Sequence, residues 1–380
     1  MNLLLLKGGC SSKFVYSLAQ FNIFTNHCYL VFRRHKGYCN TCKKVRSEKL
    51  DFISPESPHK STEYSWWVGR LCEISTIKKV SELLKEQSST TWRLDYKRMK
   101  RMLSKYKIPK ATKICVDEVY ARRKIGSGET RDDLFLTVIC DLETRRVIWV
   151  SSSRRREALD EFFLIIGKRA CEDMKVVATD MHDDYGVSIK EHCKNAVQVW
   201  DRFHVMQAFG KVLNDERIKL HSEAEKGSEE KYLSRGKFRF NFTKKASCRT
   251  KEEQAHIDDL IKENEKFSAL EIIKEGMHEF FRQKTEVDAK EVFDVLGGFI
   301  IQKDFKLLWK WHNYMETRWD NLKNYFGARY TTSLSEGMNN VIKTIKKQGY
   351  GYRNMHYFKL KIMQVCGYLN SKFTQDPLIE

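Results

Sequence analysis

The chain has 380 residues, 41% of them hydrophobic and 12% aromatic, which is enough apolar surface for a sizeable core and excludes an intrinsically disordered protein. Lys and Arg number 69 against 50 Asp and Glu, and this net charge of +19 predicts a polyanionic partner such as nucleic acid. The 11 cysteines are scattered and no apolar run has membrane-spanning length, so we expect a cytoplasmic protein with reduced thiols and no membrane partner.

The N-terminal region is predicted to be irregular at first and helical afterwards. Residues 1–55 are basic and contain one CxxC pair, at Cys39 and Cys42. Two of the four prolines lie in the segment SPESPH, which is typical of a linker. Helical spacing follows and ends before Pro109, so we place a helical unit at residues 60–108.

Residues 110–208 have the pattern of an α/β domain. Helical spacing marks the segments 156–170 and 183–193, and short apolar runs between them predict strands. The predicted strands cover residues 113–120, 134–140, 146–150, 175–180 and 196–201. The order strand, strand, strand, helix, strand, helix, strand predicts a mixed sheet, and it is the order of the RNase H fold.

The rest of the chain is predicted to be helical. Residues 209–328 are charged and aromatic without a convincing strand, so we expect an all-α insertion. Its tryptophans Trp309, Trp311 and Trp319 are expected in the core rather than on the surface as platforms for bases. Residues 329–380 are expected to supply the C-terminal helices of the RNase H-like core.

Three carboxylates are candidate ligands for a pair of divalent metal ions. Asp117 and Asp180 each close an apolar strand, where the loops of an open α/β sheet leave room for substrate. Glu336 lies on a later helix, and two Mg²⁺ ions about 4 Å apart, held by carboxylates, catalyse phosphodiester cleavage. Singly, each Asp is also typical of a turn, and Glu336 of a capping box with Ser333. Their combination in this order favours the catalytic interpretation.

The helix that carries Glu336 is predicted to be amphipathic. Its apolar face is formed by Leu334, Met338, Val341, Ile342 and Ile345. The polar face that includes Glu336 also presents Asn340, Lys343 and Lys347. These three side chains would hold DNA phosphates beside the metal ions.

Two further motifs have two interpretations each. In DRFH, Asp201 and His204 either lie near the metals and the scissile phosphate, or Asp201 caps the next helix beside a structural His204. Arg154, Arg155 and Arg156 begin a helix, where cations oppose the helix dipole. A DNA phosphate contact and a solvated surface patch explain this arginine run equally well.

The motif strings VDEVY, LFLTVICDLETRRVIWV, ATDMHDDYG, VWDRFHV and SLSEGMNNVIKTIKKQGYGYRN resemble the ISL3 family of prokaryotic insertion-sequence transposases. The resemblance extends from about Thr112 to the C-terminus. It implies an RNase H-like core with a helical insertion, a DDE triad at Asp117, Asp180 and Glu336, and a functional role for Asp201 and His204. It also implies two Mg²⁺ or Mn²⁺ ions per site, DNA as partner, a homodimer or larger assembly on DNA, and a place at the nucleoid.

The same resemblance interprets the N-terminal third. Such transposases carry a zinc ribbon with two CxxC knuckles, followed by a helix-turn-helix. Here Cys39 and Cys42 supply one knuckle and a second CxxC is absent, so residues 1–55 are expected to be a degenerate or truncated ribbon and a bound Zn²⁺ is disfavoured. Upstream, only Cys10, His27 and Cys28 offer further ligands.

Residues 76–103 fit the helix-turn-helix. One helix face is expected from Ile77, Val80, Leu83 and Leu84, a turn near Gln87, and a second helix capped by Ser88 or Ser89. That basic helix would enter the major groove and present Thr90, Thr91, Arg93, Lys97 and Arg98. An ordinary helical hairpin is the alternative.

The sequence therefore predicts a DDE transposase that binds terminal inverted repeats and catalyses metal-dependent cleavage and strand transfer. Two alternatives stay open. One is an RNase H-like nuclease that cuts DNA without joining it. The other is a non-catalytic DNA-binding protein from a decayed element, which the incomplete zinc ribbon would favour.

Overall fold

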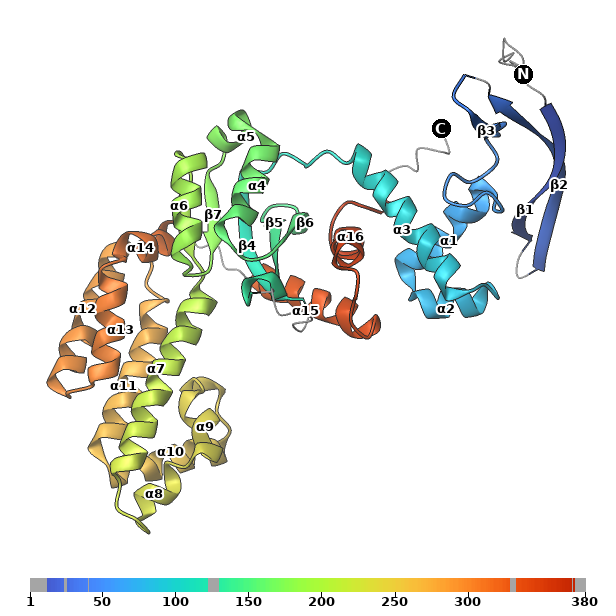
Figure 1. Cartoon of the computed structure of the whole chain (residues 1–380). Helices are drawn as coiled ribbons and strands as arrows, with labels where there is room; N and C mark the ends of the chain where they lie inside the picture. Colours follow the sequence, from blue (N-terminus) through green and yellow to red (C-terminus); the bar gives the residue numbers. More distant parts are fainter. Residues whose placement is uncertain are drawn as a thin grey trace.

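The computed structural model describes residues 12–23, 26–39, 41–121, 130–328, 333–370 and 372. Along the chain, an N-terminal sheet and a group of three helices precede a central sheet, from which a set of long helices extends (Figure 1). The last two helices, α15 (Ser333–Gln348) and α16 (Met355–Val365), pack on the central sheet again. None of the described helices is long and apolar enough to cross a membrane.

An antiparallel sheet forms the N-terminal part. Its strands are β1 (Ser12–Ile23), β2 (Asn26–Cys39) and β3 (Lys44–Ser47), in that order. The prediction that this segment is irregular is therefore wrong. Aromatic and β-branched residues recur along β1 and β2, and they favour strands even where the overall composition is basic.

Helices α1, α2 and α3 share a small apolar core. They span Thr62–Ile74, Ile77–Leu83 and Ser88–Lys105. Ser61 and Thr76 cap the first two, because each side chain accepts a hydrogen bond from the backbone of the first turn. The core between the helices is formed by Tyr64, Val68, Cys72, Val80, Leu84 and Leu94. The helices expected between residues 60 and 108 are therefore present.

Two details of that helix prediction are wrong. Leu83, expected on the buried face, is 53% exposed, because successive residues lie about 100° apart around a helix and Leu84 takes the buried side. Gln87 occupies the N-cap position of α3 and makes no side-chain cap bond. The hydroxyl of Ser88 instead lies 2.8 Å from that of Ser81, which ties the start of α3 to α2.

The central sheet has five strands in the order β6-β5-β4-β7-β8. Strands β4, β5 and β6 are antiparallel neighbours, and β7 and β8 continue the sheet parallel to β4. The strands span Lys113–Tyr120 (β4), Phe135–Asp141 (β5), Arg146–Ser152 (β6), Val176–Thr179 (β7) and Val197–Trp200 (β8). The predicted mixed α/β sheet is confirmed, and it is consistent with an RNase H-like DDE domain.

Helices cover both faces of this sheet. One face packs against α4 (Arg156–Ile166), α5 (Lys168–Glu172) and α6 (Asp183–His192). The other packs against α3, α15 and α16. Because side chains alternate along a strand, Cys115 and Val119 of β4 face α15 and α16, whereas Ile114 and Val116 face α4 and α6.

Eight α-helices and two short 3₁₀ turns follow β8 without a strand between residues 202 and 328. The helices are α7 (Arg202–Glu223), α8 (Glu229–Leu233), α9 (Arg239–Thr243), α10 (Lys251–Glu263), α11 (Glu265–Phe280), α12 (Glu286–Gln302), α13 (Lys306–Glu316) and α14 (Trp319–Ala328). They form the helical insertion that the sequence predicts.

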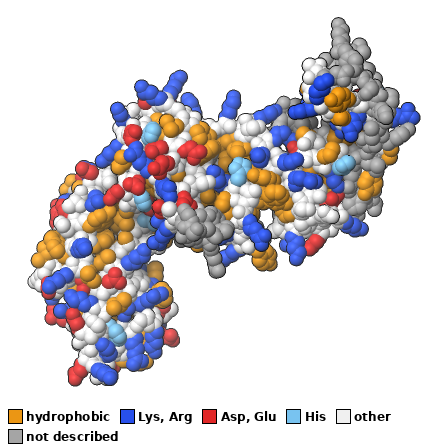
Figure 2. Space-filling model, in the orientation of Figure 1, with side chains coloured by type: hydrophobic (Ala, Val, Ile, Leu, Met, Phe, Trp, Pro, Cys, Tyr) orange, Lys and Arg blue, Asp and Glu red, His pale blue; other side chains and the backbone are white. Residues whose placement is uncertain are grey.

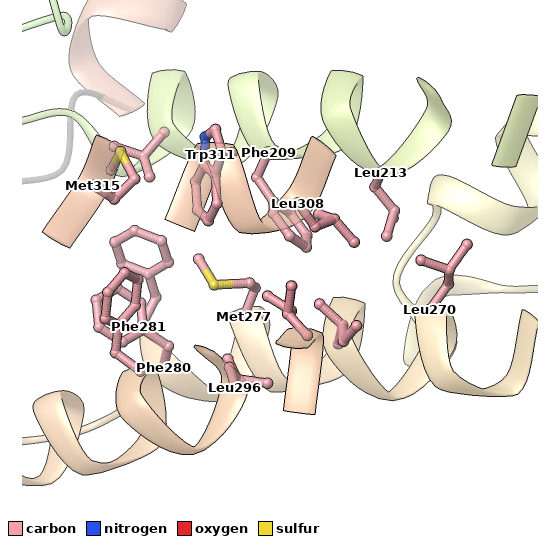
Figure 3. Close-up of a cluster of buried hydrophobic side chains, with 14 of the residues drawn as sticks. Phe209, Leu213, Leu270, Met277, Phe280, Phe281, Leu296, Leu308, Trp311 and Met315 are labelled. Carbon is pink, nitrogen blue, oxygen red and sulfur yellow. The ribbon is translucent and has the colours of Figure 1, made fainter. Parts of the chain in front are cut away.

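The insertion has its own hydrophobic core. Side chains of α7, α11, α12 and α13 meet in it, among them Phe209, Met277 and Leu308 (Figure 3). Trp311 is 8% exposed and Trp319 packs against the cluster, as predicted. Trp309 is 40% exposed, so its prediction as a core residue is wrong, because it points from the opposite side of α13.

Candidate active site

The carboxyl ends of three neighbouring parallel strands lie at one edge of the central sheet. The pairing Cys115↔Ala178 between β4 and β7, extended by two residues, places Asp117 opposite Asp180. The pairing between β7 and β8, extended by one residue, places Asp180 opposite Asp201. Adjacent strands lie about 4.8 Å apart, so these three positions form a row across the sheet.

Asp117 lies on the sheet face that α15 covers. It lies within β4 rather than closing it, because the strand continues to Tyr120. Its Oδ1 accepts a hydrogen bond from the Glu118 backbone N–H at 2.7 Å. Its Oδ2 accepts one from Nδ2 of Asn339 on α15 at 2.8 Å, so this bond ties the C-terminal helix to the strand.

Asp180 directly follows β7, as the sequence predicts. Its side chain is half-buried, and its Oδ1 accepts a hydrogen bond from the backbone N–H of His182 at 3.0 Å. Thr179 donates its hydroxyl to the Asp180 carbonyl oxygen at 2.8 Å. These two bonds fix the turn that leads from β7 into α6.

Asp201 caps α7, and it also belongs to the row of carboxylates. Its side chain is 3% exposed, and Oδ1 accepts a hydrogen bond from the Phe203 backbone N–H at 2.8 Å. Oδ2 lies 3.3 Å from Nδ1 of His204, close enough for an ion pair but without the angle of a hydrogen bond. The N-cap interpretation of Asp201 is therefore confirmed, and a role of Asp201 and His204 near the metals stays a prediction.

The negative charges of the carboxylate row act on the imidazole of His204. Burial lowers the pKa of His204, but the interaction with Asp201 and the charges of Asp117, Asp201 and Asp180 raise it by more, so the net shift of the pKa is upward. The negative potential that causes the shift is also what a cation would meet at this edge of the sheet.

Glu118 points from β4 to the opposite face, towards α4 and α6. Tyr185 donates its hydroxyl to Glu118 at 3.0 Å, and Arg154 lies 3.5 Å away. Burial and the charge of Asp180 raise the pKa of Glu118 to about 6, although Tyr185 and Arg154 act in the other direction. Sequence reasoning missed Glu118, and its place next to Asp117 on an apolar strand is the signal that could have found it.

Helix α15 presents the expected polar face beside Asp117. Asn340, Lys343 and Lys347 are exposed, as predicted. On the apolar side, Ile342 and Ile345 are buried and Met338 packs against the core, but Val341 is 43% exposed. The prediction for Val341 is wrong, because the helix contacts the sheet along a narrower stripe than the periodicity suggested.

The side chain of Glu336 lies outside the described part of the structure, as does that of Leu334, so neither the metal site nor the capping box with Ser333 is described. The backbone of α15 places residue 336 one helical turn before Asn339, the residue bonded to Asp117. Sequence reasoning missed Asn339. Its spacing of three from Glu336 places it on the same side of the helix, but Asn340, at a spacing of four, satisfies the same pattern.

Among the described side chains, no three of His, Cys, Asp and Glu converge closely enough to hold a metal ion together. The carboxylates of the row instead bond to neighbouring backbone and side-chain donors.

The arginine run at the start of α4 is paired with carboxylates. Arg154 Nε donates to Asp132 at 2.7 Å, and its guanidinium lies over the ring of Phe135 at 4.6 Å. Arg155 bonds to Thr130 at 2.8 Å and lies 3.5 Å from Asp133. Arg156 pairs with Glu191 and, at 3.2 Å, with Asp160. These contacts pair the arginines with carboxylates of neighbouring elements, and a DNA contact of the arginine run stays a prediction.

Helix α3 exposes part of the surface expected to contact DNA. Arg93 and Lys97 are exposed and Thr90 is half-buried. Thr91 and Arg98 are each 1% exposed, so the prediction that they contact bases or phosphates is wrong. Arg98 pairs with Glu73 of α1 at 2.9 Å. Another buried α3 residue, Asp95, accepts a 2.6 Å hydrogen bond from Tyr357 of α16.

Cys39 and Cys42 face each other across the turn between β2 and β3. Hydrogen bonds from the Cys42 backbone and thiol and from Thr41 lower the pKa of Cys39 to about 7. Cys28 lies near the other end of β2, about 36 Å away at the usual rise of a strand. It therefore cannot complete a zinc site with this pair, and Cys10 lies outside the described residues.

Comparisons with known proteins agree with this arrangement. A family model of the ISL3-type DDE transposases matches residues 114–362 of this chain, and the description of that family is transposase. The transposase for insertion sequence element IS1001 of Bordetella parapertussis is 24% identical over 348 residues, which is 90% of this chain and 82% of that protein. The transposase for IS1557 of Mycobacterium tuberculosis (strain CDC 1551 / Oshkosh) is 28% identical over 112 residues, 29% of this chain and 25% of that protein.

Proposed function

This chain belongs to the ISL3 family of DDE transposases, and from that premise we propose that it cuts DNA at the terminal inverted repeats of an insertion sequence and joins the ends to a target. The observation that supports this most is the row of Asp117, Asp180 and Asp201 at the ends of three parallel strands. Helix α15, which carries Glu336, is bonded to the first of them.

Asp117, Asp180 and Glu336 are the proposed ligands of two Mg²⁺ or Mn²⁺ ions, with Asp201 beside them. Carboxylate oxygens are the ligands that Mg²⁺ prefers, and Oδ2 of Asp180 accepts no hydrogen bond from any described residue. The upward pKa shift of His204 reflects an excess of negative charge here. When bound, such ions activate water and stabilise the leaving oxygen in phosphodiester cleavage and transesterification.

The remaining side chains bind and orient DNA in this proposal. His204 contacts the scissile phosphate in this proposal, while Asp201, whose Oδ2 lies 3.3 Å from Nδ1, orients its ring. Asn340, Lys343 and Lys347 line the exposed face of α15 next to the carboxylates and contact phosphates.

Helices α2 and α3 are proposed as the helix-turn-helix that reads the element ends. The exposed Arg93 and Lys97, with Thr90, point away from the core that α1 and α2 form with α3. Thr91 and Arg98 stabilise that helix group instead. The N-terminal sheet supplies one knuckle, the thiols of Cys39 and Cys42. Its described residues include no complete zinc site.

A transposition assay in cells tests the proposal. The donor plasmid carries a marker between the DNA segments that flank this gene, and the full chain is supplied from a second plasmid. Asp180→Asn is expected to lower transposition at least about 1,000-fold, because the amide no longer provides a charged ligand. Asp184→Asn, which changes an exposed carboxylate at the start of α6, is the matched control and is expected to transpose normally.

The outcomes separate the proposed function from its alternatives. Wild-type transposition by Asp180→Asn would show that the carboxylates are assigned wrongly. Donor cleavage with no joining of pre-cut ends would identify a nuclease. DNA binding with neither cleavage nor joining by the unaltered protein would identify a non-catalytic DNA-binding protein.

A further inference from the structure

A basic segment lies at the far end of the helical insertion. From residue 231 to residue 251, every charged side chain is Lys or Arg. The segment covers most of α8, the whole of α9 and the first residue of α10. In Figure 2, Lys and Arg side chains gather at the lower end of the molecule, where Figure 1 places α8 and α9.

Some of these cations are used within the fold. Arg249 and Lys274 share the carboxylate of Glu271, at 2.7 and 2.8 Å. Lys244 pairs with Glu253 at 2.7 Å. These contacts fix the loop between α9 and α10 on α11, so their charges are compensated and do not attract a partner.

Among the other cations, Arg235, Lys237 and Arg239 are exposed and form no ion pair with a carboxylate in the described part of the chain. These three lie over aromatic rings instead. Arg235 and Lys237 lie 4.8 and 5.1 Å from the ring of Tyr232, and Arg239 lies 4.4 Å from the ring of Phe240. These five residues are called the insertion patch below.

The aromatic members of the patch are themselves exposed. Tyr232 is 46% and Phe240 is 65% exposed, so the rings do not serve the hydrophobic core. Contacts between cations and rings at exposed sites stabilise a fold by only about 0.5–1 kcal/mol each. Alternating exposed cations and rings is a pattern typical of nucleic-acid-binding surfaces.

The uncompensated charge also acts on neighbouring groups. Burial lowers the pKa of Arg217, and the charge of Arg239 lowers it further. Burial likewise lowers the pKa of His221, together with the charges of Lys231, Arg217 and Arg235. The part of each shift that comes from these cations indicates that their positive charge acts on the end of α7.

Helix α7 sets the distance between the patch and the row of carboxylates. It begins directly after Asp201 and runs for 22 residues, about 33 Å, to Glu223, close to the start of α8. Duplex DNA rises about 3.4 Å per base pair, so α7 spans about ten base pairs, or one helical turn. Arg239 acts on Arg217 and Arg235 acts on His221, so the patch lies about 24–30 Å along α7 from Asp201, or about seven to nine base pairs. A duplex that runs along α7 with one phosphate near Asp201 would therefore present its backbone again near the patch.

We propose that the insertion patch is a second DNA-binding surface, which holds the backbone of duplex DNA about one helical turn away from the scissile phosphate. The spacing rests on the proposed function, because it is counted from Asp201. The chemistry recognised is the phosphodiester backbone rather than base edges, since the patch offers cations and ring faces without a helix of groove-entering length.

A binding experiment with the full chain tests the proposal. The probe is a fluorescein-labelled 40-base-pair duplex of arbitrary sequence, titrated in EDTA at several salt concentrations. The variant R235A/K237A/R239A is expected to reduce the slope of log K against log salt by about 2.7, since each lost phosphate contact accounts for about 0.9. At 0.15 M salt its affinity is expected to fall about 100-fold.

The matched control removes three exposed lysines elsewhere, in K175A/K190A/K194A. These residues lie at the amino ends of β7 and β8 and the last turn of α6, opposite the row of carboxylates. The control is expected to keep the wild-type salt slope. Equal losses of duplex affinity in both variants would overturn the proposal, since net charge alone would then explain binding. No loss of affinity in either variant would also overturn it, since another surface would then bind the duplex.

Two further measurements complete the test. If the triple variant loses binding to single-stranded RNA but keeps binding to the duplex, the proposal is overturned and the patch belongs to an RNA partner. If circular dichroism shows that the triple variant is unfolded, Lys237→Glu repeats the test with one exposed change. A slope unaffected by Lys237→Glu would then count against the proposal.

Spacing is tested separately from catalysis. In cleavage of donor-end duplexes, the triple variant and the wild type are expected to become equal once fewer than about ten base pairs remain on either side of the cut. A difference that persists on shorter duplexes would overturn the stated distance. Asp180→Asn still binds the 40-base-pair duplex if the patch works as proposed, so failure of the catalytic assignment leaves the binding result readable.

Discussion

Two arginine-rich segments of this protein differ in what folding places beside them. Arg154 and Arg156 lie against carboxylates from neighbouring elements. Arg235, Lys237 and Arg239 lie against aromatic rings, with no ion pair in the described part of the chain. The first segment pairs its charge within the fold, and the second is the one that we propose to bind DNA. The number of basic residues in a segment therefore does not show how many of them folding pairs with carboxylates.

The same contrast appears between two adjacent residues of α15. Asn339 is half-buried and donates to Asp117, whereas Asn340 is exposed beside the lysines. Asn339→Ala is expected to raise the Mg²⁺ concentration needed for half-maximal cleavage about 10- to 100-fold, because a residue that orients a metal ligand typically has an effect of this size. Cleavage measured against Mg²⁺ concentration checks this.

Asn340→Ala is the matched control for Asn339→Ala. It is expected to leave the Mg²⁺ dependence unchanged and to weaken only DNA binding, because its side chain faces solvent. Identical Mg²⁺ curves for the two variants would contradict the distinction between a paired and an unpaired side chain on this helix.

Arg154→Ala is expected to lower the free energy of unfolding by about 2 kcal/mol. The change leaves Glu118, whose side chain is 11% exposed, without its cation. Breaking a fully buried pair costs about 3–5 kcal/mol, and the partial exposure of Arg154 reduces that figure. Urea unfolding measures the loss, and duplex affinity is expected to change less than about twofold.

Arg155→Ala is the control for Arg154→Ala, since its ion pairs are exposed and contribute about 0.5 kcal/mol. Loss of duplex affinity in Arg154→Ala with unchanged stability would reverse the comparison of the two segments. The arginine run would then be a DNA site despite its carboxylate partners.

Phe240→Ala is expected to have the smallest effect on the affinity for duplex DNA, less than about twofold. In a duplex the bases stack on one another, so their faces cannot reach the phenylalanine ring. Single-stranded DNA is expected to bind about fivefold more weakly, since one stacking platform is worth about 1 kcal/mol or more. Trp309→Ala, which removes an exposed ring of α13, is the control. A larger loss on duplex than on single-stranded DNA would contradict the role given to the ring.

The sequence was sufficient to predict the elements that carry the row of carboxylates. Apolar runs that end near Asp117, Asp180 and Asp201 are local signals, and parallel pairing brings their ends together. The choice between Asn339 and Asn340 was not predictable, because it depends on the rotation of α15 against β4. Periodicity marks a broad polar face, whereas the contact selects one residue of it.

Packing between distant segments explains why the role of Arg98 was predicted wrongly. Arg98 is of a residue type that often contacts DNA, but its side chain is buried against α1. On the same helix, Asp95 bonds to Tyr357, a residue more than 250 positions away. Such long-range contacts leave no periodic signal in the sequence. The pairing of Arg154 with Glu118 was not predictable from the sequence for the same reason.

The central claim is that Asp117, Asp180 and Glu336 hold the same metal ions. Fe²⁺ bound in place of Mg²⁺ to the full chain, with ascorbate and hydrogen peroxide, breaks the backbone close to its ligands, and mass spectrometry locates the breaks. Our account predicts breaks within a few residues of positions 117, 180 and 336 that excess Mg²⁺ suppresses. Breaks confined to Cys39 and Cys42, or breaks that Mg²⁺ does not suppress, would contradict it.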